Sequence, residues 1–187
     1  MFKFNKKVKG LALSSSKGFT LLELLVVIGI IGLLASIVVV NLTGARKRAR
    51  DTKRIGDLRG IQTALEDYYG RYSKYPAGYI DALKTDGQLP ITPVDPLQVS
   101  GTACTANALN CYYYAYYPSA NPYSYHIGAN FEDGSSALLN QDRGCVSNTS
   151  AGTNCPYAAL YTNGFNGANT QACDGATANR YCYDIAQ

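Results

Sequence analysis

A strongly apolar stretch without any charged residue runs from Leu24 to Val40, directly after one acidic residue, Glu23. A helix needs about 20 apolar residues to cross a lipid bilayer. The segment 19–40 has that length, and Glu23 is its one charged residue. We therefore predict a membrane-spanning helix over 19–40. Because a carboxylate within an apolar segment is costly, Glu23 is a candidate functional residue.

After Val40 the pattern becomes amphipathic. Apolar or aromatic positions recur every three or four residues, which is typical of one face of a helix; they are Leu42, Ala45, Ala49, Thr52, Ile55, Leu58, Ile61, Leu65, Tyr68 and Tyr72. We expect a single helix from about Thr20 to Tyr72, ending within 70–74, because Tyr75 precedes Pro76 and residues before proline avoid helical conformation. The predicted organisation is a leader, 1–18, a helix, 19–74 (apolar over 19–40, amphipathic over 41–74), and a head, 75–187.

Strand signals appear only in the head. Residues 76–110 are rich in Pro, Gly, Asp and Thr and predict a connecting loop, with one short helix over 79–84. The aromatic run 111–118 and the segment 123–131 predict an antiparallel hairpin. Segment 181–185 predicts a last strand, and 140–180 predict long loops. The expected fold class is α+β, with a long N-terminal helix packed on a small antiparallel sheet whose loops are stapled by disulfides.

The heptapeptide KGFTLLE at residues 17–23, followed by the apolar run, resembles the N-terminus of type IV prepilins and type II secretion pseudopilins. The resemblance implies that a prepilin peptidase cleaves after Gly18 and methylates the new N-terminal Phe19. It also implies that Glu23 pairs with the N-terminus of a neighbouring subunit during filament assembly. Gly29 and Gly32 would permit close helix approach, as small residues do in membrane packing.

The implied function is that of a structural subunit of a type IV pilus or pilus-like filament. The alternatives are a pseudopilin of a type II secretion system and a single-pass, membrane-anchored binding module. The resemblance implies as partners other copies of the chain, the prepilin peptidase, and an assembly platform protein with its ATPase. It places the head outside the cytoplasmic membrane before assembly, and the filament in the periplasm or outside the cell. Lys74-Tyr75-Pro76 and Asp95-Pro96 resemble the major pseudopilin branch.

The formal net charge of +4 does not indicate a nucleic-acid partner, because residues 1–18 contain five lysines and no acid. Removing them leaves a charge of about −1, so the basic character belongs mainly to a processed segment. A second basic cluster lies over 46–59. It has three interpretations: a solvated face near lipid headgroups, a site for a polyanion, or salt bridges to the acidic C-terminal half of a neighbouring subunit.

Six cysteines all lie in the head, which predicts disulfides in an oxidising compartment; they are Cys104, Cys111, Cys145, Cys155, Cys173 and Cys182. Fifteen connectivities are possible. We expect sequential pairs, because each would staple one short loop. Zinc is the alternative, but the sequence has no CxxC pair.

We expect no enzymatic activity. The one histidine, His126, lies in a predicted strand, where it is expected to pack or face solvent, and the neighbouring Ser124 would point to the opposite face. The tyrosine-rich strands predict a sheet with one face on the helix and one exposed; an adhesive aromatic surface for carbohydrate or single-stranded DNA is the alternative. No cofactor or catalytic residue is assigned, and no metal site. Calcium is the remaining candidate, with oxygen ligands from Glu132, Asp133, Asp142, Asp174 and Asp184.

Overall fold

The computed structural model describes residues 18–98 and 110–187, without the side chains of residues 38–41. It divides into two compact units, 1–41 and 42–187, which are considered separately. The main helix, α1, spans Leu21–Tyr72 and confirms the predicted long helix. The predicted leader lies outside the described residues, except for Gly18.

The start and end of α1 follow local backbone rules. Thr20 accepts two hydrogen bonds from the first turn of α1. Its carbonyl accepts from the Leu24 N–H at 3.2 Å, and its hydroxyl accepts from the Glu23 N–H at 3.2 Å. At the other end, Ser73 has a positive φ of 54°, and its N–H donates to the Tyr69 carbonyl. A residue in this conformation just past the last turn stops a helix.

Among the described residues, no single helix is both long enough and apolar enough to cross a membrane. The segments Leu21–Ile37 and Leu42–Tyr72 reach the required length and apolar composition only as a pair.

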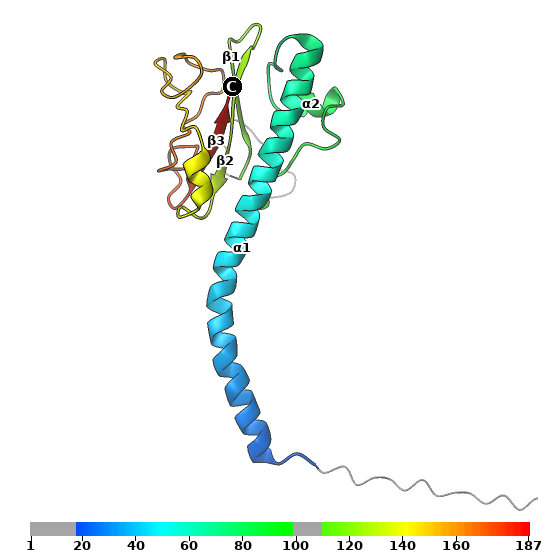
Figure 1. The fold of residues 1–187 in the computed structure, drawn as a ribbon, viewed down its shortest axis with the longest axis vertical. Coiled ribbons are helices and arrows are strands. Elements are labelled where there is room, and N and C mark those ends of the chain that lie inside the picture. Colours follow the sequence, from blue (N-terminus) through cyan, green and yellow to red (C-terminus); the bar gives the residue numbers. More distant parts are fainter. Residues whose placement is uncertain (1–17, 99–109) are drawn as a thin grey trace, which may run out of the picture. The chain divides into compact units, whose positions relative to one another are not determined.

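The second unit contains a three-stranded antiparallel sheet in the order β1-β2-β3. The strands are β1, Tyr113–Tyr117, β2, Ser124–Phe131, and β3, Tyr181–Ala186. All three lie where the sequence predicts strands. Tyr114 of β1 pairs with Ile127 of β2, which pairs in turn with Ile185 of β3. Figure 1 shows the C-terminal part of α1 beside one face of this sheet and the segment 137–180 on the other.

The face toward α1 forms the main core, because alternate strand residues point to the same side. Leu58, Ile61 and Leu65 of α1 are completely buried in it. The sheet contributes mostly aromatic side chains, namely Tyr112, Tyr114, Tyr116, Tyr125, Ile127, Ala129, Phe131 and Tyr183. The short helix α2, Asp81–Thr85, adds Leu83 to the same core.

The opposite face is also buried, so the expectation of one solvent-exposed tyrosine face is wrong. Every residue of β2 is buried. The cause is the loop segment 144–173, whose Phe165 ring lies on Gly128; a Cβ there would be 2.7 Å from that ring. Tyr113 therefore packs against Phe165, with 5.2 Å between ring centroids, rather than facing water.

Two disulfides hold these loops. Cys145 bonds Cys155, and Cys173 bonds Cys182, which are sequential pairs. The second bond ties the loop directly to β3, and both of its cysteines are buried. Cys111 is also disulfide-bonded, but Cys104, its expected partner, lies outside the described residues. The remaining loops include a short 3-10 helix, η1, over Ala137–Gln141.

Candidate functional site

The N-terminal segment contains the residues to which the sequence assigns processing and assembly. Gly18 and Phe19 precede the helix in extended chain, and Phe19 is 81% exposed. Glu23 lies in the first helical turn, where the unpaired N–H groups and the helix dipole favour a negative charge. Its backbone N–H is capped by the Thr20 hydroxyl.

Sequence reasoning missed this cap. Threonine followed three residues later by glutamate is the first half of a capping box, and that spacing was a sufficient signal for it. Thr20 fixes where the helix begins, and so it fixes how far the Glu23 carboxylate lies from the backbone nitrogen of Phe19. The cap therefore positions the two residues to which the sequence assigns methylation and assembly, Phe19 and Glu23.

Every side chain described between Phe19 and Ile37 is exposed. The exposed residues are large and aliphatic, for example Leu21 at 82% and Leu33 at 66%. A Cβ added at Gly29 or Gly32 would have nothing within 4 Å among the described residues. Contacts within the chain therefore do not explain why these two positions are glycine.

A second feature joins α1 to the head through charge. Arg54 is completely buried, and its guanidinium contacts three carboxylates. Its Nε and Nη2 donate to Asp95 at 2.6 and 3.0 Å, and its Nη1 donates to Asp51 at 2.6 Å and to Glu132 at 3.0 Å. Burial alone would lower the pKa of Arg54, but the hydrogen bonds to these carboxylates raise it above its ordinary value.

Arg50 and Arg48 extend this set of ion pairs toward the surface, and we name Arg48, Arg50 and Arg54 with their carboxylate partners the arginine cluster. Arg50 makes two hydrogen bonds to Glu132, at 2.7 and 2.6 Å, and Arg48 contacts Asp133 at 3.1 Å. Although burial opposes ionisation of Glu132, the bonds from Arg50 and Arg54 lower its pKa to about 2. The salt bridges that the sequence suggested between subunits thus form within one chain. The exposed Arg46 and Lys47 remain candidates for the headgroup or polyanion interpretations.

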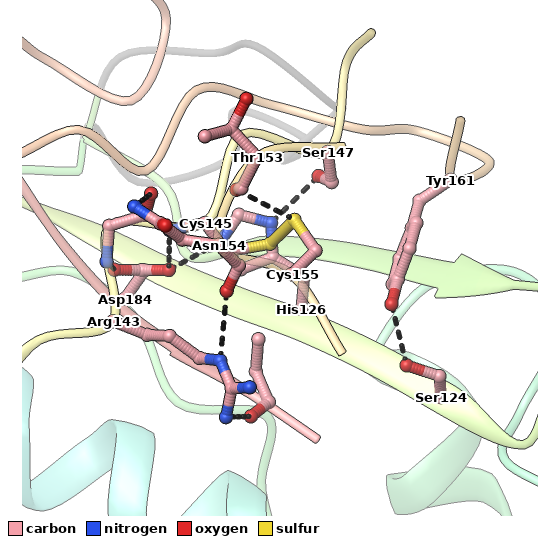
Figure 2. Close-up of a disulfide and its surroundings, with 12 residues drawn as sticks. Ser124, His126, Arg143, Cys145, Ser147, Thr153, Asn154, Cys155, Tyr161 and Asp184 are labelled. Atoms are coloured by element: carbon pink, nitrogen blue, oxygen red, sulfur yellow. Dashed lines mark hydrogen bonds and ion pairs between the residues drawn. A yellow bond between two sulfur atoms is a disulfide. The ribbon is translucent and has the colours of Figure 1, made fainter. Parts of the chain in front are cut away.

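His126 is fully buried in β2 and belongs to a hydrogen-bonded network that the sequence did not predict. Its Nδ1 lies 2.7 Å from Ser147 Oγ and its Nε2 lies 2.8 Å from Asp184 Oδ2. The ring stacks on Phe165 with 3.7 Å between centroids. Burial lowers the pKa of His126 despite the neighbouring carboxylate, which favours the neutral imidazole. Figure 2 shows this network beside the Cys145–Cys155 disulfide.

A serine, a histidine and an aspartate in a row resemble a catalytic set, but here they hold loops on the sheet. The Ser147 hydroxyl is already bonded to the backbone of Phe165, at 3.1 Å to its N–H and 3.2 Å to its carbonyl. Asp184 accepts from the N–H groups of Gly144 and Cys145. The expectation that Ser124 points away from His126 is wrong, because residues two apart in a strand lie on the same face. The Ser124 hydroxyl bonds Tyr161 at 2.7 Å, as Figure 2 shows.

His126, Cys145 and Asp184 also bring three potential metal-ligand atoms within 4.8 Å of one another. The Cys145 sulfur is bonded to Cys155, however, and a metal ligand must be a free thiolate. The oxidised chain therefore does not offer a three-ligand site at this point.

Three of the five acids considered for calcium are engaged elsewhere. Glu132 and Asp133 pair with arginines of α1, and Asp174 bonds the Thr177 hydroxyl and two backbone N–H groups. Asp142 and Asp184 line one shallow pocket. Burial and the charge of Asp184 raise the pKa of Asp142 to about 7.

Comparison with known proteins is informative for the N-terminal part of the chain. Residues 13–39 match the family model of the prokaryotic N-terminal methylation motif. The chain is 47% identical over 62 residues to type II secretion system core protein G of Klebsiella michiganensis, which is 33% of this chain and 44% of that protein. It is 40% identical over 80 residues to core protein G of Dickeya chrysanthemi, covering 43% of this chain and 52% of that protein.

A pilus protein is also similar. The type IV wide pilus major component PilA4 of Thermus thermophilus is 60% identical over 38 residues, which is 20% of this chain and 29% of that protein. The chain thus spans about half or less of the length of these curated relatives. No solved structure matches it significantly. The chain thus carries the prokaryotic N-terminal methylation motif, and over part of its length it is similar to type II secretion pseudopilins and to a type IV pilin.

Proposed function

We propose that the chain is a structural subunit of a type IV pilus or pilus-like filament, cleaved after Gly18 and polymerised through the first half of α1. The observation that carries the proposal is the exposed apolar surface of residues 19–37, in which Glu23 is the one charged side chain. Leaving a large aliphatic side chain in water rather than burying it costs about 1.5–3 kcal/mol. Such a surface is stable only in lipid or against other copies of itself.

Cleavage would give Glu23 a partner. The new α-amine of Phe19 would lie four residues before the carboxylate, and in a filament the amine of a neighbouring subunit would approach it. An ion loses several kcal/mol of hydration free energy when it is buried without a partner. Pairing with an amine offsets that loss only in one axial register, so the charge would select how subunits stack. Gly29 and Gly32 would let neighbouring helices approach closely.

Before assembly, the same segment would anchor the chain in the cytoplasmic membrane with the head outside. The lysines of the leader favour a cytoplasmic N-terminus. Two disulfides in the head suit an oxidising compartment. The proposed partners are the prepilin peptidase and the platform protein and ATPase that drive assembly.

A secretion pseudopilus is the second candidate. It is favoured by the similarity to core protein G, which extends over 80 residues in one relative, whereas the pilus relative matches over 38. A match of 80 residues is longer than the methylation motif at residues 13–39, so this similarity is not confined to the motif. Deletion of the gene separates the two: loss of surface fibres supports a pilus, and loss of exoprotein release with intact fibres supports a pseudopilus.

Peptide mass spectrometry of the N-terminus tests the proposal directly. We expect a peptide beginning at methylated Phe19 in filaments sheared from the cell surface or, for a pseudopilus, in envelope complexes. Inactivation of the prepilin peptidase should shift it to peptides that retain Lys17 and Gly18. An N-terminus retaining Met1 in cells with an active peptidase would contradict the proposal and favour a membrane-anchored binding module.

A further inference from the structure

Three tyrosines form a surface patch at the hairpin end of the sheet, which we name the tyrosine surface: Tyr117, Tyr123 and Tyr157. Tyr123 and Tyr157 are 44% and 43% exposed, and Tyr117 is partly buried. The ring centroids of Tyr123 and Tyr157 lie 5.0 Å apart, and those of Tyr117 and Tyr123 lie 5.9 Å apart. The rings come from β1, from the residue before β2 and from the loop after Cys155.

The rings are held in place from behind. Tyr117 stacks on buried Tyr161 at 5.5 Å between centroids, and the Tyr161 hydroxyl is fixed by Ser124. The loop that carries Tyr157 is tied to β1 by two backbone hydrogen bonds between Tyr116 and Thr162, of 3.2 and 2.9 Å. A surface fixed in this way loses little conformational entropy when it binds a ligand.

The loop also depends on a glycine directly under Tyr157. Gly152 has a positive φ of 26°, and a Cβ there would lie 2.9 Å from the Tyr157 carbonyl oxygen and 2.8 Å from the Ala159 nitrogen. The Cys145–Cys155 disulfide closes the same loop two residues before Tyr157. The exposed position of this ring is thus built into the loop.

The segments that supply the tyrosine surface carry no charge. Residues 110–131 and 144–173 contain no Asp, Glu, Lys or Arg. Arg143 borders the second segment, but its guanidinium donates to the backbone carbonyls of Asn154 and Ala186, as Figure 2 shows for Asn154. Apart from Tyr123, Tyr157 and Leu160, the exposed residues in these segments are mostly small or polar, including Ser119, Asn121 and Asn163.

We propose that the tyrosine surface binds a neutral oligosaccharide. Tyrosine presents a flat apolar ring together with a hydroxyl group, and so it can pack on the C–H face of a hexose while hydrogen-bonding its hydroxyl groups. Surrounding Asn and Ser side chains supply adaptable hydrogen bonds, as they do in antibody combining sites. Nucleic acids and anionic glycans fit less well, because their binding depends on Lys and Arg. The inference goes beyond the filament function and does not depend on it.

Binding of the full-length chain to immobilised cellohexaose, maltohexaose and chitohexaose tests this. The chain is kept in a zwitterionic detergent, because glycoside detergents would compete for the surface. We expect binding to at least one of these sugars that does not change between low and high salt. The double variant Tyr123→Ala/Tyr157→Ala should bind about tenfold or more weakly, because two stacking contacts are lost.

Two further variants separate ring stacking from folding. Tyr123→Phe/Tyr157→Phe keeps both rings and should retain most of the binding. Tyr69→Ala removes a ring that is 37% exposed on α1, outside the patch, and should bind like the wild type. Near-ultraviolet circular dichroism, which reports tyrosine packing, shows whether each variant is folded.

Three results would overturn the proposal. One is the absence of binding to all three sugars, and another is equal binding by the wild type and the folded Ala double variant. The third is binding to heparin alone with loss at high salt, which would indicate a polyanion. If the Ala variant instead loses self-association while no sugar binds, a second copy of the chain covers the tyrosine surface, which also rejects a sugar ligand.

Discussion

The two halves of α1 share one secondary structure but differ in what surrounds them. From Leu21 to Ile37 every side chain is exposed and Glu23 is the only charged residue. From Leu42 to Tyr72 one face is buried in the head, and even a charged residue, Arg54, is completely buried against three carboxylates. Residues of the second half are explained by contacts within the chain. The side chains described in the first half are exposed, which is consistent with the proposed assembly through this segment.

This difference teaches where substitutions should act. A change in the first half should alter assembly and leave the head intact, whereas a change in the second half should destabilise the head. The 16 tyrosines all lie at or after Tyr68. Near-ultraviolet circular dichroism of tyrosine therefore reports the head and the last turns of α1, and a filament assay reports the first half of α1.

The largest expected effect is the loss of filaments in Glu23→Ala. Without the carboxylate, the amine of Phe19 on a neighbouring subunit has no partner, and the axial register loses its specific contact. We expect membrane insertion and cleavage as in the wild type, no filaments by electron microscopy, and an unchanged thermal midpoint of the head. Glu23→Gln, which keeps the shape and removes the charge, should behave in the same way. Normal filaments from either variant would refute the pairing mechanism.

The next effect concerns the arginine cluster. Arg54→Met leaves the carboxylates of Asp51, Asp95 and Glu132 without their shared cation, and breaking a buried ion pair costs about 3–5 kcal/mol. The free energy of unfolding, from urea titrations followed by tyrosine circular dichroism, should fall by that amount. Arg48→Ala is the matched control, because its side chain is 75% exposed and an exposed pair contributes about 0–1 kcal/mol. Equal losses in the two variants would mean that burial does not set the contribution of this cluster.

A somewhat smaller loss is expected from the loop staple. Cys145→Ser/Cys155→Ser removes a disulfide between residues ten apart, and disulfides typically stabilise by about 2–4 kcal/mol. The loop covers the sheet face that contains His126, so the variant should also expose that face to amide hydrogen exchange. Exchange rates of α1 amides are the internal control and should change only through global stability. Unchanged amide hydrogen exchange around β2 would show that the loop covers the sheet without the Cys145–Cys155 disulfide.

The sequence predicted the regular elements well, because their signals are local. The period of apolar residues marked α1, and aromatic runs marked the strands. The KGFTLLE segment was also readable, since its residues are consecutive. The sequence does not predict contacts between residues far apart in the chain. These are the contacts of Arg54 with Asp95 and Glu132, and those of His126 with Ser147 and Asp184.

The prediction of a solvent-exposed tyrosine face failed for the same reason, because its burial depends on residues far away in the chain. Consecutive tyrosines in β1 place rings on both faces of the sheet, and the sequence alone predicts that the second face meets water. The loop that buries it is rich in Asn, Gly and Thr and gives no periodic signal. Its cover includes Phe165, which rests on Gly128, and the buried Tyr161. These aromatic residues within a polar loop are the clue that the sequence contained.

The smallest expected effect is a pH dependence of folding stability caused by Asp142. Within the described part of the chain this carboxyl lacks a cationic partner, in contrast to the paired carboxylates of the arginine cluster. Burial and the charge of Asp184 raise its pKa to about 7 from 3.8. Its buried Oδ2 atom has no hydrogen-bond partner among the described residues. The folded state therefore holds a proton that the unfolded state has already released. Stability should fall with rising pH between about 4 and 7 on account of this group alone.

Asp142→Asn should remove that dependence. The thermal midpoint of the variant should equal that of the wild type near pH 4, exceed it increasingly up to pH 7, and stay higher by a constant amount at pH 8. His126 and Glu132 titrate in both proteins, so their contributions cancel in the difference. Scans in the presence of a chelator prevent cations from stabilising the ionised carboxylate. A difference in thermal midpoint that does not change with pH would contradict this prediction. It would mean that Asp142 ionises in the folded head as it does in the unfolded chain, so that its surroundings do not disfavour the charge.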